Sequence, residues 1–267
     1  MLKIMVLLTS ESVSLSATSE QLECARAALE AEKSRAAAIA LVTRRMSHDM
    51  SNYVTAVRAY SELLLADLPA TGSAHADVLE IHRAADAMIH YMQRIGRFTQ
   101  VAVERPGTVQ LDAAINSIIK ENAAAPRIRA VLLSEATVRI EARWLVDAMN
   151  ELIANAIEAS PQHSLVDVRA STKIIAVPMI DGGVPIEAGV WACIEVADSG
   201  AGIDEDIKRR ALDPFVTTKI AERCAGFGLT LARSAVWQAG GQLVLDGPSV
   251  KKPGTQVRLW LPVTGRA

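Results

Sequence analysis

The chain of 267 residues has few aromatic residues, few cysteines and no long apolar run. Aromatic residues make up 4% of it, which argues against an aromatic-rich β sandwich and favours closely packed, alanine-rich helices. The three cysteines form no CxxC pair, which disfavours a disulfide framework and fits a reduced, cytoplasmic setting. The apolar stretch from Met1 to Leu8 is far too short to span a bilayer. The net charge of −2 excludes a whole-chain field that would draw nucleic acid or an anionic membrane.

The first third of the chain reads as two helices joined by a turn. Residues 17–67 contain no glycine or proline, and residues 74–99 follow a Pro/Gly-bearing turn at 68–73. Apolar residues recur along both helices at steps of three and four, which is typical of a bundle seam. One hairpin cannot bury both seams, so we expect an all-α hairpin that pairs into a homodimeric four-helix bundle. The seam residues are Met46, Met50, Tyr53, Val57, Tyr60 and Leu64 in the first helix, and Val78, Ile81, Ala85, Met88, Met92 and Ile95 in the second.

Composition changes near residues 104–107, and beyond this linker short β-like runs alternate with helices. This mixture predicts an α+β two-layer sandwich, with helices on one face of a sheet. We therefore expect an N-terminal segment (1–16), a helical domain (17–103) and a second domain (108–267). The expected strands cover residues 108–111, 127–133, 137–140, 164–176, 190–197, 242–245 and 256–261, and the expected helices 112–122, 142–160 and a stretch from 228 to 238.

Polar residues in the middle of the first helix form a group that a core would not use. His48 and Asn52 lie one helical turn apart, away from the seam, and Asp49 follows His48 directly. A histidine, a carboxylate and an amide in this arrangement suit a nucleophile, a proton acceptor and a group that orients water. Taken alone, the same residues also fit an ordinary solvated helix surface.

Four segments of the second domain carry glycine or polar residues between apolar elements. Glu151 and Asn155 share a helix face, and an Asn carbonyl oxygen is a suitable Mg²⁺ ligand beside substrate phosphates. An aspartate followed by two glycines ends a strand, where it can accept a hydrogen bond from an exocyclic amine. A loop with hydroxyls and a lysine follows, and glycines then open a helix whose N–H groups can face an anion. Each segment alone is equally a polar stripe, a turn or a loop. The four segments are Glu151–Ala159, Asp198–Ile203, Asp213–Lys219 and Ala225–Leu229.

The order of these segments is more specific than any one of them. HDxxN, NxxxAS, DxGxG, DPFxTTK, GxGL and GT, in this order, resemble the histidine protein kinases of two-component signalling over roughly residues 35–263. The resemblance implies a dimeric helical domain that carries a phosphorylated histidine. It also implies an ATP-binding α+β sandwich of the histidine kinase and Hsp90-like ATPase type, shared with type II topoisomerases.

The resemblance also implies roles for single residues. His48 would accept the γ-phosphoryl group, Asp49 would hold or accept its proton, and Asn52 would orient water during dephosphorylation of a response regulator. Asn155 would hold Mg²⁺, and Asp198 would read adenine. The remaining nucleotide-binding positions would be Gly200, Gly202, Thr218, Lys219, Gly226, Gly228, Leu229 and Thr255.

Two positions depart from the usual pattern of the family. Glu151 stands where many histidine kinases have asparagine, and in the related ATPases a glutamate there activates the hydrolytic water. Cys224 replaces the first glycine of the usual GxGxG, in a short lid. These departures bear on turnover and lid closure, and Cys224 itself is expected to be inert rather than an oxidant sensor.

The predicted function is a protein-histidine kinase that autophosphorylates His48 from Mg-ATP and passes the phosphoryl group to an aspartate of a response regulator. Phosphatase activity toward that regulator is also expected. The alternatives are a histidine phosphotransferase with a degenerate ATP domain and a nucleotide-switched scaffold. The expected partners are a second copy of the chain, a response regulator and an upstream sensor protein, because about 47 residues before His48 leave no room for a sensory domain. No nucleic-acid partner and no membrane span are expected.

Overall fold

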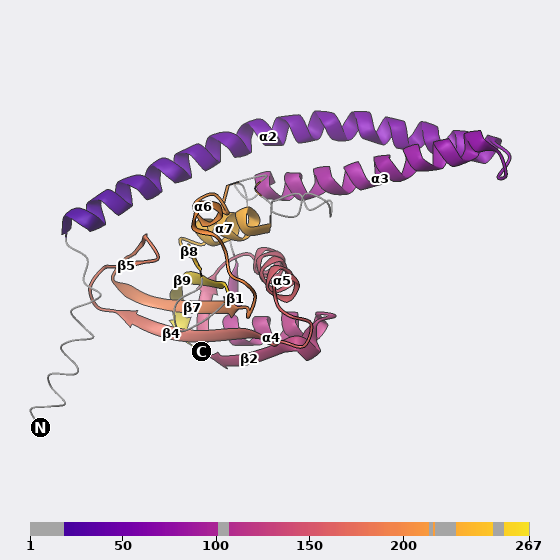
Figure 1. The fold of residues 1–267 in the computed structure, drawn as a ribbon. Coiled ribbons are helices and arrows are strands. Elements are labelled where there is room, and N and C mark those ends of the chain that lie inside the picture. The colour runs from indigo at the N-terminus through magenta and orange to yellow at the C-terminus, as the bar shows by residue number, and fades with distance from the viewer. Residues whose placement is uncertain (1–18, 101–106, 214–215, 217–227, 248–253, 267) are drawn as a thin grey trace, which may run out of the picture. The chain divides into compact units, whose positions relative to one another are not determined.

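The computed structural model describes residues 19–100, 107–213, 216, 228–247 and 254–266. The chain divides into two compact units, Lys33–Val103 and the combination of Met1–Glu32 with Glu104–Ala267. Figure 1 shows two long helices followed by a sheet with its own helices, as the sequence predicts. None of the described helices has both the length and the apolar character that a membrane span requires.

The helical unit is built from most of α2 (Ser19–Asp67) and α3 (Ser73–Gln100). Leu68–Gly72 forms the turn between them, where Pro69 prevents a helix from continuing. The buried residues of α2 in this unit recur every seven positions, at Ser47, Val54 and Ser61. These are small or short side chains, so the two helices can approach each other closely.

The apolar seam of α2 is not the face that packs on α3. Val57 is 48% exposed and Tyr53 is 72% exposed. In α3, Ala85 is buried whereas Ile81 and Met88 are about half exposed. A single chain thus leaves a strip of large apolar side chains uncovered, and such strips mark interaction surfaces. The exposed seam residues of α2 are Met46, Met50, Tyr53, Val57, Tyr60 and Leu64.

The second unit contains a seven-stranded mixed sheet in the order β1-β3-β9-β7-β4-β2, with β8 also paired to β9. Only β2 and β4 run parallel among these pairs. The strands are β1 (Thr108–Gln110), β2 (Ile128–Leu133), β3 (Ala136–Arg139), β4 (Val166–Ile175), β7 (Gly189–Ala197), β8 (Gln242–Asp246) and β9 (Gln256–Arg266). The helices are α4 (Leu111–Glu121), η1 (Ala125–Arg127), α5 (Ala142–Ala159), α6 (Glu205–Lys208) and α7 (Gly228–Gln238).

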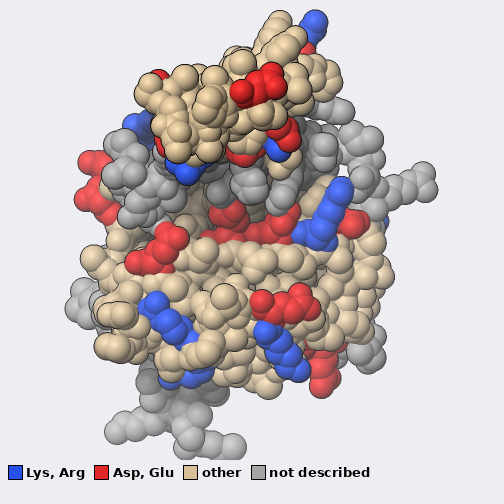
Figure 2. Space-filling model, turned by 90° about the vertical axis from the view of Figure 1, so that its right-hand side faces the viewer, with Lys and Arg blue, Asp and Glu red and all other residues tan. Residues whose placement is uncertain are grey.

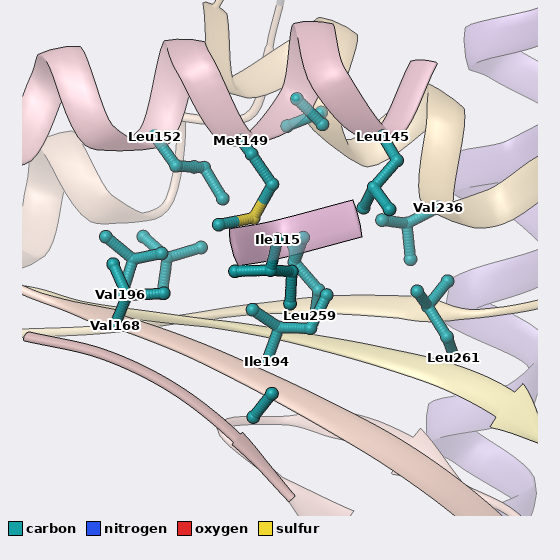
Figure 3. Packing of buried hydrophobic residues seen from close by; sticks show 14 of the residues in the cluster. Ile115, Leu145, Met149, Leu152, Val168, Ile194, Val196, Val236, Leu259 and Leu261 are labelled. Atoms are coloured by element: carbon teal, nitrogen blue, oxygen red, sulfur yellow. The ribbon is translucent and has the colours of Figure 1, made fainter. Parts of the chain in front are cut away.

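One face of the sheet is covered by α4, α5 and α7, as expected for the sandwich. Side chains alternate across a strand, so Ile194 and Val196 of β7 point into this core while Cys193 points to the other face. Figure 3 shows Met149 and Leu152 of α5 lying above these strand residues. Burial of such large apolar side chains is the main stabilising contribution, about 1.5–3 kcal/mol for each.

A small hairpin covers part of the opposite face and was not predicted. Residues 179–186 lie between the expected strands 164–176 and 190–197, and they form β5 (Met179–Asp181) and β6 (Val184–Ile186). Trp191, Cys193 and Trp260 of the sheet pack with Ile186 in a second cluster beneath it. Burial raises the pKa of the Cys193 thiol to about 12, so this thiol stays protonated and inert.

Candidate nucleotide site and phosphoacceptor helix

Asp198 lies directly after β7 and is held by the main chain on two sides. Its Oδ1 accepts hydrogen bonds from the N–H groups of Gly200, at 2.8 Å, and Thr255, at 3.0 Å. The Asp198 N–H in turn donates to the Thr255 carbonyl oxygen, at 2.9 Å. One carboxylate oxygen, Oδ1, is thus fixed by two main-chain N–H groups. This arrangement fits the expected adenine reader.

Glycines permit this close packing around Asp198. A Cβ on Gly254 would overlap the Asp198 carbonyl oxygen, and Gly254 has φ +100°, a conformation that side chains rarely adopt. A Cβ on Gly200 would overlap the carbonyl oxygen of Ala159, at the end of α5. Gly202 also has a positive φ, +86°. The structure therefore brings Asp198, Gly200 and Thr255 together in one cluster, here called the cradle, in which the glycines let main-chain atoms pack closely.

The polar pair of α5 lies against the start of α7. A Cβ on Gly228 would lie 2.5 Å from Glu151 Oε2 and 3.5 Å from Asn155 Nδ2. The first residue of α7 therefore contacts both side chains, as the predicted phosphate and metal region requires. Leu229, the next residue, packs against the hydrophobic core. It thus anchors the start of α7.

Two further side chains hold α7 in place. The hydroxyl of Thr230, which is buried, donates to the Leu212 carbonyl oxygen at 3.1 Å. Arg233 is also buried, stacks on Trp237 and pairs with Glu32 of α2. Burial lowers the pKa of the Arg233 guanidinium, and the carboxylates of Glu32 and Asp213 oppose this shift.

His48 lies on the surface of the helical unit, and its side chain is 76% exposed. Its Nδ1 is 3.4 Å from Oδ1 of Asp49, whose side chain is also exposed. Asn52, one turn further on, is exposed as well. An Nδ1–H directed at Asp49 places the imidazole lone pair on Nε2, toward solvent. His48 is therefore a surface side chain and not a core histidine, as the predicted phosphoacceptor role requires.

Another histidine of the helical unit has a structural role. His82 Nδ1 is 2.9 Å from the buried hydroxyl of Ser61, and His82 Nε2 is 3.5 Å from Asp86. Arg58 of α2 donates to Asp86 at 2.7 Å. These contacts join α2 to α3, so His82 helps to hold the helical unit together.

Part of the expected phosphate region lies outside the described residues. This applies to Thr218, Lys219 and Gly226, and also to Cys224 of the lid. Among the residues that are described, no three His, Cys, Asp or Glu side chains gather as a metal site. Asn155 beside Gly228 suits a Mg²⁺ ion that keeps waters and shares its other ligands with phosphates, so the donor set fits that ion.

Sequence reasoning missed three residues that build the site. Gly254 shapes the wall behind Asp198, Thr230 ties α7 to the segment before Asp213, and Ser160 accepts a hydrogen bond from the Ser199 N–H at 3.3 Å. The motifs NxxxAS and GT contained Ser160 and Gly254, so the signal was present. Thr230 follows the GxGL motif and belongs to no motif that would mark it in the sequence.

The family described as "Histidine kinase-, DNA gyrase B-, and HSP90-like ATPase" matches residues 140–265. This range contains Asp198, the α5 pair and both glycine segments of the cradle. The family match therefore covers the residues that the sequence predicts to bind nucleotide and that the structure describes.

Similar curated proteins cover most of this chain at low identity. The sensor histidine kinase ZraS of Escherichia coli O157:H7 is 25% identical over 86% of this chain and 48% of its own length. The sensor kinase CckA of Brucella abortus is 23% identical over 87% of this chain and 25% of its own length. The nitrogen regulation protein NtrY of Azorhizobium caulinodans is 26% identical over 86% of this chain and 30% of its own length. The chain thus spans about half or less of the length of these relatives.

A solved structure of full-length ShkA in complex with AMPPNP has the same fold. It aligns with a TM-score of 0.60 and 20% identity, covering 84% of this chain and 46% of that one. At this identity the likeness supports the order and type of the domains, a helical region followed by a sandwich, and confirms the predicted fold class.

Proposed function

We propose that the chain is a sensor histidine kinase with an ATPase domain of the histidine kinase, DNA gyrase B and HSP90 type, and that it transfers the γ-phosphoryl group of ATP to His48. The cradle around Asp198 carries the proposal, because main-chain N–H groups anchor its carboxylate and glycines let the surrounding main chain pack closely against it. The presence of this ATPase domain leaves the degenerate phosphotransferase without support.

In the proposed reaction, Nε2 of His48 attacks the γ-phosphorus. An N–P bond forms as the bond from phosphorus to the bridging oxygen breaks, and ADP leaves with that electron pair. The ring then carries a positive charge, which Asp49 stabilises beside Nδ1 before the Nδ1 proton is lost. Phosphoryl transfer depends on positioning and charge neutralisation, so the exposed position of His48 is essential.

Asn155 would hold a Mg²⁺ ion beside the start of α7, where the ion would neutralise phosphate charge. Glu151 is the neighbouring carboxylate and would orient water or a phosphate-bound ion there. The N–H groups at Gly228 would contact phosphate through the positive end of α7. Thr218, Lys219 and Gly226 remain proposed phosphate contacts.

The decisive experiment is incubation with γ-labelled ATP and Mg²⁺, followed by an acid-lability test. We expect an acid-labile, base-stable label that His48→Ala removes while nucleotide binding survives. His163→Ala, in an exposed turn, is the matched control and should keep the label. Label retained on the His48→Ala protein would refute His48 as the acceptor.

The metal role is tested separately from the acceptor role. Asn155→Ala should lose Mg-dependent ATP binding, measured by calorimetric titration with and without Mg²⁺. Unchanged affinity in Mg²⁺ would contradict the proposed ligand.

The exposed seam of α2 supports a homodimer as part of the proposal, because pairing would bury these side chains. A response regulator is the proposed recipient of the phosphoryl group. Asn52→Ala should keep autophosphorylation and slow the dephosphorylation of that regulator. ATP as substrate and unpaired Cys24 and Cys193 fit a reducing, cytoplasmic location.

A further inference from the structure

The loop that carries Asp198 is attached to the end of α5. Ala159 is the last residue of the helix and Ser160 is its C-cap, with the Ser160 N–H donating to the Ala156 carbonyl oxygen at 3.1 Å. The carbonyl oxygen of Ala159 touches Gly200 so closely that no side chain would fit between them. The end of α5 is therefore one wall of the base cradle.

Ser160 makes the polar contact across this junction. It is 8% exposed, and its Oγ accepts the N–H of Ser199, the residue between Asp198 and Gly200. Three consecutive residues of the loop are thus fixed by hydrogen bonds: Asp198 through Thr255, Ser199 through Ser160, and Gly200 through the Asp198 carboxylate. The third bond, together with the one from the Thr255 N–H, sets the carboxylate. The bond between the Ser199 N–H and Ser160 Oγ sets the position of the loop relative to the end of α5.

The same helix carries Asn155, a little more than one turn before Ser160. A rigid helix that ends in the loop anchor therefore sets the separation between the proposed metal ligand and the proposed base reader. A nucleotide spans these two positions, so a small shift of the loop would spoil the contact with the base while the phosphate end stays in place.

We propose that Ser160 is a positioning residue for base recognition: its hydroxyl fixes the loop so that Asp198 Oδ2 meets the exocyclic amine of the base. This inference rests on the proposed function, in which Asp198 reads adenine. The serine does not itself touch the reacting groups, and its effect passes through the Ser199 N–H. Losing one neutral hydrogen bond changes affinity by about two- to tenfold.

The test compares ATP with purine riboside triphosphate, which lacks the 6-amino group, by titration against the full chain. The unaltered protein should prefer ATP. Ser160→Ala should weaken ATP binding about two- to tenfold and leave the analogue within about twofold, so the preference falls. Ser160→Thr keeps the hydroxyl and should restore the preference. Ser164→Ala, four residues further on, is the matched control and should leave both affinities unchanged.

The outcomes separate this inference from the function on which it rests. Equal weakening of both nucleotides by Ser160→Ala, or no weakening of either, overturns the positioning role while ATP binding stands. An unaltered protein that binds both nucleotides equally overturns the base-reading role of Asp198, and this inference falls with it. If Ser160→Ala does not fold, Ser160→Cys, nearly the same size with a weak acceptor, is titrated and judged by the same criteria.

Discussion

The glycines of the nucleotide cradle contribute mainly because they have no side chain. Gly254 has neither a Cβ nor a side chain, and the carbonyl oxygen of Asp198 occupies the space that a Cβ would need. Gly200 and Gly228 are similar, each facing an oxygen atom of α5. The shape of the site thus depends on the missing side chains of these glycines as well as on the Asp198 carboxylate and the Asn155 amide, to which its chemistry is assigned.

Gly254→Ala should weaken ATP binding by at least about tenfold. The left-handed backbone costs about 1–3 kcal/mol for a residue with a side chain, and the new methyl group would push Asp198 from its position. Fluorescence titration with a labelled nucleotide measures the loss. Gly265→Ala is the control, because a Cβ there meets only the Thr137 Cβ, at 3.9 Å. An ATP affinity preserved in Gly254→Ala would contradict the steric account of the cradle.

At the scale of elements, the β5–β6 hairpin is an independent addition to the sheet. Asp181 of β5 accepts two hydrogen bonds from Arg258, at 2.8 and 2.6 Å, and one from the indole N–H of Trp260, at 2.8 Å. Asp246 also pairs with Arg258. The Asp181 bonds attach the hairpin to β9, and the Asp246 pair ties β8 to the same arginine, on the face opposite α5 and α7.

Asp181→Ala should lower the free energy of unfolding of the ATPase domain by about 2–4 kcal/mol, because it leaves Arg258 and Trp260 without their main acceptor. Affinity for ATP should change by less than about twofold, since the hairpin lies on the other face of the sheet. Urea unfolding and nucleotide titration measure the two quantities. Asp206→Ala, in an exposed pair with Arg209, should cost less than about 1 kcal/mol. A large loss of ATP affinity would show that the two faces are coupled.

The sequence predicted the long elements well because their signals are local. The glycine-free run before Leu68 became one helix, and the apolar repeat from Trp144 to Ile153 became α5. The hairpin was missed although Asp181-Gly182-Gly183 is a hairpin turn signal, with φ of 54° and 85° at the two glycines. Its strands are only three residues long, too short for an alternating pattern to show.

The site was predictable in its residue types and not in its contacts. Asp198, Asn155 and His48 were predicted because each stands in an ordered motif. The anchoring of Asp198 Oδ1 by main-chain N–H groups was not predicted, because a main-chain N–H group is common to nearly all residue types and the sequence does not show where it points. The same reason hides Ser160, whose partner is the N–H of Ser199.

At the scale of the whole molecule, the charges of the chain are mixed rather than separated. Figure 2 shows acidic and basic side chains interspersed among uncharged ones on the face in view. Within one compact unit, Arg26 of α2 donates to Glu187 at 2.7 and 2.6 Å, although 161 positions separate them. The hydrogen bond from Arg26 holds the pKa of the Glu187 carboxyl below its usual value.

This ion pair should contribute a pH-dependent part of the stability. Because the pKa of Glu187 is lower in the folded chain, its contribution is complete above the unfolded pKa and disappears as the pH falls through the folded value. The difference in Tm between the unaltered chain and Glu187→Gln should therefore be largest near pH 7 and shrink below about pH 4. Thermal unfolding at a series of pH values measures it. A difference that grows on acidification would contradict this assignment.

The helical unit should determine the assembly state. Val57→Glu places a charge in the exposed apolar strip of α2, and burying it in a partner interface would be costly, so we expect monomers. Sedimentation velocity distinguishes monomer from dimer. Thr55→Glu, exposed but outside the strip, is the matched control and should stay dimeric. A dimer that survives Val57→Glu would place the interface elsewhere.

The anchoring of Asp198 by peptide N–H groups has a consequence for evolutionary drift. Substitutions change side chains and leave peptide groups in place, so most of them cannot delete the donors from Gly200 and Thr255. The anchoring is lost only when the path of the backbone changes, and substitution of a few glycines would cause such a change. We therefore expect the anchoring of Asp198 to tolerate many substitutions of the side chains around it.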